Sequence, residues 1–133
     1  MYTRQYPKYK ILFFFIMFCL PLYVEAQIHL GESLSYLKAH YPKEIFKVEY
    51  TTDTKKKYTT MSNNMGEFTY VFDNKTGLIH LIIQVPKDLR SLNKQVETYN
   101  TNYETISENL WKVGDTLEIK LFFSNNEFVF YYY

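Results

Sequence analysis

Alternation of apolar and polar residues with a period of two recurs along most of this chain. That pattern is typical of strands with one buried face, and the stretches that carry it are rich in aromatic and β-branched residues. Turn-forming Asn, Asp and Gly separate several of them by only a few positions, so neighbouring strands should pair antiparallel. The expected strands are Ile45–Thr51, Tyr58–Met61, Phe68–Phe72, Leu78–Val85, Leu117–Phe123 and Glu127–Tyr133. Leu78–Val85 is apolar on both faces, which indicates a central strand covered on both sides.

Two segments change to the spacing of an α-helix. The first begins after Ser33, a good N-cap, and ends at Tyr41-Pro42, because the residue before proline avoids helical angles. The second begins after Asp88, and its apolar residues recur at spacings of three and four with expected fraying after Asn100 or Asn102. The apolar positions of that helix are Leu89, Leu92, Val96, Tyr99, Tyr103 and Ile106.

Together these segments predict an α+β fold of about six antiparallel strands, with both helices packed on one face of the sheet. The expected order of elements is α-β-β-β-β-α-β-β, with no internal repeat. Trp111 should be a core residue in the passage to the fifth strand.

The first 26 residues are typical of a secretory signal peptide. Basic residues up to Lys10 precede the apolar run Ile11–Leu20, and Pro21 ends that run before the small residue Ala26. The apolar stretch is shorter than the roughly 20 residues of a spanning helix. We therefore expect cleavage after Ala26, with an uncleaved anchor as the alternative, and a single domain over residues 27–133.

Composition narrows the function of that domain. The whole chain has a formal net charge of +1, which argues against a nucleic-acid binder, and its one cysteine, Cys19, lies in the predicted leader. An exported domain without disulfides must be held together by its apolar core. We expect a secreted or periplasmic protein with no transmembrane segment after cleavage of the leader.

Residues that could support catalysis are sparse. The three histidines, His29, His40 and His80, form no metal-binding pair, and we expect them at sheet-surface or helix-cap positions. The chain has no G-x-S-x-G nucleophile motif and no glycine-rich phosphate loop. The sequence therefore predicts a protein that is not an enzyme and has no cofactor or metal site.

The last six residues, from Phe128 to Tyr133, are apolar or aromatic without interruption. On a strand, Phe128, Phe130 and Tyr132 point to one side and should belong to the core. The opposite side would then present aromatic residues, which mark binding surfaces when they form an exposed patch. The candidate partner-binding residues are Phe122, Val129, Tyr131 and Tyr133, with Val71 as a possible neighbour.

The segment Ile28–Leu37 contains Gly31, Ser33 and Leu37 in the pattern G-x-[ST]-x-x-x-[LV]. It resembles the helix opening in the families of the β-lactamase inhibitor protein and of the small lipoprotein of the outer-membrane barrel-assembly machinery. That resemblance implies a protein-binding module built from helices and an antiparallel sheet. The expected order of elements is also similar to that of the secretion-chaperone fold.

The leading hypothesis is an exported binding domain that contacts a protein or a cell-envelope component through aromatic residues. Contact could use the sheet face, or the C-terminal strand could add to a partner's sheet if it lies at an edge. The alternatives are a carrier of a small apolar ligand or lipid between helices and sheet, and a small hydrolase without a recognisable motif.

Overall fold

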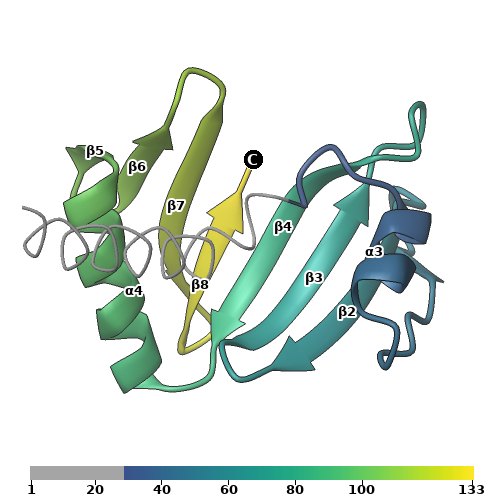
Figure 1. Cartoon of the computed structure of the whole chain (residues 1–133), viewed down its shortest axis with the longest axis horizontal. Helices are drawn as coiled ribbons and strands as arrows, with labels where there is room; N and C mark the ends of the chain where they lie inside the picture. Colours follow the sequence, from purple (N-terminus) through teal and green to yellow (C-terminus); the bar gives the residue numbers. More distant parts are fainter. Residues whose placement is uncertain (1–28) are drawn as a thin grey trace, which may run out of the picture.

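A computed structural model of the chain describes residues 29–133, so the predicted leader and its cleavage site lie outside the described residues. These residues form one antiparallel sheet of eight strands in the order β1-β2-β3-β4-β8-β7-β6-β5, with two helices (Figure 1). The helices are α3 (Leu34–His40) and α4 (Leu89–Asn102). The strands are β1 (Glu49–Tyr50), β2 (Lys57–Asn63), β3 (Gly66–Phe72), β4 (Ile79–Pro86), β5 (Glu104–Ser107), β6 (Leu110–Val113), β7 (Leu117–Ser124) and β8 (Glu127–Tyr132).

The α+β class agrees with the sequence prediction, but the number and order of strands do not. The order is α-β-β-β-β-α-β-β-β-β, because β5 and β6 fill the segment expected to be a fraying helix and a loop. The helix ends at Asn102, since Tyr103 has extended angles of φ −125° and ψ 160°. Ile106 continues the helical spacing only by coincidence. Strands of four residues are too short to show a clear alternation.

The first strand was also predicted wrongly, since only Glu49–Tyr50 of the expected Ile45–Thr51 forms a strand. Phe46 is buried, but it packs from a segment outside the sheet ladder. β2 is longer than expected because its pairing with β3 runs from Tyr58 opposite Val71 to Asn63 opposite Gly66, and Lys57 pairs with Tyr50 of β1.

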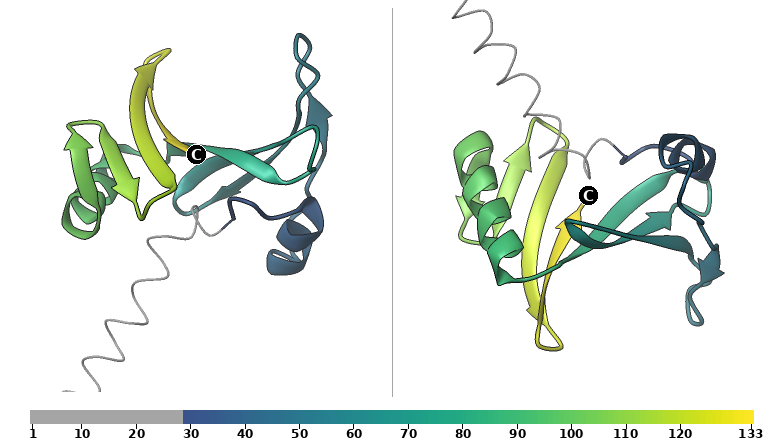
Figure 2. Two further views of the ribbon diagram at one scale, coloured as in Figure 1. Left: turned by 90° about the horizontal axis from the view of Figure 1, so that it is seen from above. Right: turned by 60° about the horizontal axis from the view of Figure 1, so that its bottom comes forward.

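Both helices begin at the predicted caps. The Ser33 hydroxyl accepts a hydrogen bond from the Tyr36 amide at 3.1 Å, and the Asp88 carboxylate accepts one from the Ser91 amide at 2.7 Å. Both helices lie on the same side of the sheet, as the left view of Figure 2 shows. The core lies between them and the sheet, and its largest fully buried side chains are Trp111, Tyr70, Tyr99, Tyr132, Phe72 and Phe130. None of the helices in residues 29–133 is long and apolar enough to cross a membrane.

The Asp88 cap makes a pH-dependent contribution to stability. Its hydrogen bonds with Ser91 lower the pKa of the carboxyl group, so the cap stabilises the fold above the unfolded pKa and is lost as pH falls through the folded one. We expect Asp88→Ala to lower the urea midpoint at pH 7, and the difference from wild type to shrink towards about pH 2. Asp88→Asn is the control, because an uncharged cap should hold at both pH values. A difference that persists undiminished in acid would contradict this role.

The described chain consists of two units with the same architecture. Each unit is a helix followed by a four-stranded antiparallel meander: α3 with β1–β4, and α4 with β5–β8. The fourth strands of the two units, β4 and β8, pair at the centre of the sheet, so the strand order is mirrored about that line. The pairing covers three residue pairs, from Ile82 opposite Tyr132 to Gln84 opposite Phe130. We call this line the seam; no sequence repeat predicted it.

Candidate partner-binding face

One face of the sheet has neither helix packed on it, and we call it the helix-free face. Ile82, Phe130 and Tyr132 point to the opposite side, where they are fully buried. Because side chains alternate along a strand, Ile83 and Tyr131 point to the helix-free face, where they lie directly opposite each other across the seam.

All four predicted site residues lie together on the helix-free face. Phe122 is paired with Val129 across β7 and β8, and its ring centroid lies 4.9 Å from that of Tyr131 at an angle of 56°. Tyr133 follows on the same side of the chain and is 44% exposed. The other three are half-buried. The structure therefore brings these residues into one cluster.

Two charged residues of β7 border this cluster. The Lys120 ammonium lies 4.7 Å from the centroid of the Phe122 ring, in a cation–π contact. Glu118 and Tyr133 exchange two backbone hydrogen bonds, of 2.8 and 3.1 Å. Burial raises the pKa of the Tyr133 phenol above its ordinary value, and the Glu118 carboxylate raises it further. The tyrosine therefore stays protonated at neutral pH and can donate a hydrogen bond.

The apolar surface continues across the seam into the first unit, where Ile83 lies opposite Thr69 and Leu81 lies opposite Val71. All four of these side chains are half-buried, and no described element covers them. The prediction that the fourth strand is covered on both sides was therefore wrong. A β-bulge shifts the register of β3 and β4 between Val71 and Phe72. As a result, Ile79 at the start of β4 points to the helix side, where it is buried.

β8 is a central strand, paired with β4 on one side and β7 on the other. The expectation that it could add to a partner's sheet as an edge strand is therefore wrong. The edges of the described sheet are β1 and β5, which are short.

In the left view of Figure 2 the β7–β8 hairpin rises on the side away from the helices. The end of this hairpin carries Phe123 and Phe128, whose ring centroids lie 4.8 Å apart.

The histidines are placed differently from the prediction in one case. His29 is buried rather than at the surface, and its Nε2 lies 2.8 Å from the Tyr41 hydroxyl. Its ring also contacts that of His40, with centroids 5.0 Å apart. His80 is exposed on β4, as expected. No group of three or more His, Cys, Asp or Glu in residues 29–133 could hold a metal ion.

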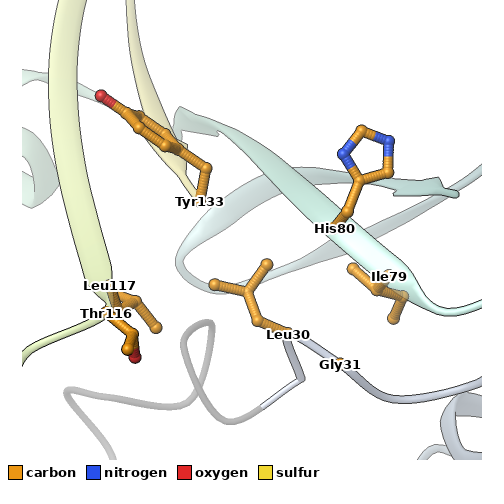
Figure 3. A pocket seen from close by; sticks show the side chains of 7 residues that line it. All are labelled: Leu30, Gly31, Ile79, His80, Thr116, Leu117 and Tyr133. Atoms are coloured by element: carbon orange, nitrogen blue, oxygen red, sulfur yellow. The ribbon is translucent and has the colours of Figure 1, made fainter.

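A pocket of about 310 Å³ lies where β8 ends and leaves β4 and β7 apart. Leu30 lies in it between Leu117 and Ile79, and His80 and Tyr133 stand at its upper rim in Figure 3. Among residues 29–133, the lining includes one imidazole, that of His80, and no Asp or Glu side chain.

No protein-family model, curated protein or solved structure matches this chain. The helix-free face is therefore the feature from which a function can be inferred.

Proposed function

We propose that this chain is exported and acts as a non-enzymatic binding protein, with the helix-free face as the surface that docks a protein partner. The observation that carries the proposal is the contiguous cluster of Phe122, Val129, Tyr131 and Tyr133 on a sheet face that no described element covers. Patches of this kind on soluble domains mark interaction sites.

The chemistry of the face favours a protein over other partners. Tyrosine and phenylalanine supply large, rigid contact areas, and tyrosine adds a hydrogen-bonding group. The charges on β6 and β7 alternate in sign, with Lys112 opposite Glu118 and Lys120 beyond them. A surface that attracts nucleic acid or anionic lipid would instead carry a one-sided positive charge.

The interior gives the carrier hypothesis no comparable support. The space between α4 and the sheet is filled by Leu92, Tyr99, Trp111, Phe130 and Tyr132, each at most 6% exposed. The pocket at the end of β8 is small, about 310 Å³, and its lining mixes Leu30, Ile79 and Leu117 with the polar side chains of His80, Thr116 and Tyr133. Export rests on the sequence features of the first 26 residues, which lie outside the described residues.

The test is a pull-down with tagged protein from the medium and envelope fractions of the producing organism. We expect wild type to recover one discrete protein in fixed proportion, and Tyr131→Ser with Tyr133→Ser to lose most of it. Tyr50→Ser is the matched control, because Tyr50 is 64% exposed but lies on β1 at the sheet edge. Circular dichroism must show all variants folded. Equal recovery by the double variant and wild type would refute the proposed face.

A further inference from the structure

Four polar side chains share a hydrogen-bond network inside the core. Gln84 and Gln95 exchange amide hydrogen bonds of 3.1 and 2.9 Å, and Gln95 also donates to the Tyr99 hydroxyl at 3.3 Å. The Tyr99 and Tyr132 hydroxyls lie 2.7 Å apart, and Tyr132 donates to the Gln84 carbonyl at 2.5 Å. The second Gln84 donor reaches the Met65 carbonyl at 3.0 Å. All four residues are at most 5% exposed.

One arrangement of protons satisfies this network. Because Tyr132 donates to Gln84, its oxygen must accept from Tyr99, and Tyr99 in turn accepts from Gln95. Each amide hydrogen of Gln84 then has an acceptor, and its carbonyl oxygen has two donors. Burial raises the pKa of Tyr132 well above its ordinary value, so the phenol keeps its proton at any physiological pH. A buried network satisfied in this way specifies one arrangement of the elements that carry it.

The network lies across the seam between the two units. Gln84 on β4 and its acceptor Met65 belong to the first unit. Gln95 and Tyr99 on α4, together with Tyr132 on β8, belong to the second. Apart from this network, β4 and β8 are joined by a pairing of only three residue pairs, compared with six pairs between β2 and β3.

The same strands carry the docking face. Gln84 and Tyr132 alternate with Ile83 and Tyr131, which meet across the seam on the helix-free side. Tyr133 exchanges its backbone hydrogen bonds with β7, so the Tyr131 and Ile83 pair is the closer, non-hydrogen-bonded kind. The position of the Tyr131 ring relative to the first unit therefore depends on the angle and distance between β4 and β8 at the seam.

We infer that Gln84, Gln95, Tyr99 and Tyr132 are positioning residues, whose network fixes the angle between the two units and thereby the shape of the docking face. The effect on binding rests on the proposed function, whereas the effect on the seam does not. The network would make the two units act as one rigid surface for a partner that contacts both.

Native-state hydrogen exchange of the purified chain tests the inference. The Gln84→Met, Gln95→Met variant removes both side-chain amides together, so neither is left buried without the other, and the fold should persist although the Tyr132 hydroxyl and the Met65 carbonyl each lose a partner. Backbone hydrogen bonds alternate between the two neighbours of β8, so the amides of Phe130 and Tyr132 point towards β4. In the variant, these two amides should exchange about tenfold faster than in wild type, or more. Amides between β2 and β3 should keep their protection, because they lie within one unit.

A hydroxyl-only variant keeps the test decisive if the double methionine variant does not fold. Tyr99→Phe with Tyr132→Phe removes two network hydroxyls and should loosen the same seam amides. Tyr103→Phe is the matched control: its hydroxyl is buried without a hydrogen-bond partner among the described residues, and burial raises its pKa to about 12. A uniform loss of protection in both units, no loss at the seam, or the same loosening in Tyr103→Phe would overturn the inference. None of these results bears on partner recovery in the pull-down, so the two proposals can fail separately.

Discussion

Gly66→Ala is expected to destabilise the fold strongly, although it adds a single methyl group. Gly66 has φ +128°, a conformation that side chains rarely adopt, and it begins β3 beside the end of β4. A Cβ there would lie 2.0 Å from the Val85 carbonyl oxygen and 2.9 Å from the Lys87 nitrogen. Both are backbone atoms, so relief requires the strands to separate. We expect a loss of roughly 3 kcal/mol or more, measured by urea unfolding.

Gly77→Ala is the control for this substitution. Gly77 also has a positive φ, of +72°, but no atom lies within 4 Å of a Cβ added there. It should therefore show only the backbone cost of about 1 kcal/mol. Equal losses in the two variants would show that the close approach of β3 and β4 at Gly66 is not the cause.

Trp111→Ala should be the most damaging truncation in the second unit. Trp111 is fully buried on β6, and its ring centroid lies 5.7 Å from that of Tyr99 and 6.4 Å from that of Phe130. Its indole nitrogen donates to the Asn100 side chain at 2.8 Å, which ties the end of α4 to the sheet. We expect a loss of about 3–5 kcal/mol in the free energy of unfolding, because the cavity cannot close fully.

Two further variants separate the contributions of Trp111. Asn100→Ala removes the hydrogen-bond acceptor and should cost about 1 kcal/mol, whereas Trp111→Phe keeps much of the packing and should fall between the two. A Trp111→Ala protein as stable as wild type by chemical denaturation would mean that β6 does not pack under α4 as described.

Local signals in the sequence predicted much of this structure. Ser33 and Asp88 cap their helices by hydrogen bonds that involve neighbouring residues only, so the sequence alone could reveal them. The alternation in β7 and β8 also predicted correctly that Phe122, Val129, Tyr131 and Tyr133 share one face. Each of these features depends on spacing within a short segment.

Features that depend on contacts between distant segments were missed. β5 and β6 form because Trp111 pairs with Ile119 and packs under Tyr99, and a four-residue strand shows little of this in its own sequence. Gln84 and Gln95 are typical surface residues by type, and they are buried because they hydrogen-bond to each other and to Met65, Tyr99 and Tyr132. The two units resemble each other in their element and strand order, and no repeat was visible in the sequence.

Site-specific photo-cross-linking most directly tests the claim that the helix-free face docks a partner. A photoreactive phenylalanine at Tyr133, exposed on that face, is compared with one at Tyr50, exposed on the edge strand. After irradiation of the producing cells and their medium, we expect one discrete adduct with a different protein from position 133 and none from position 50. No adduct from position 133, or the same adducts from both positions, would contradict the account.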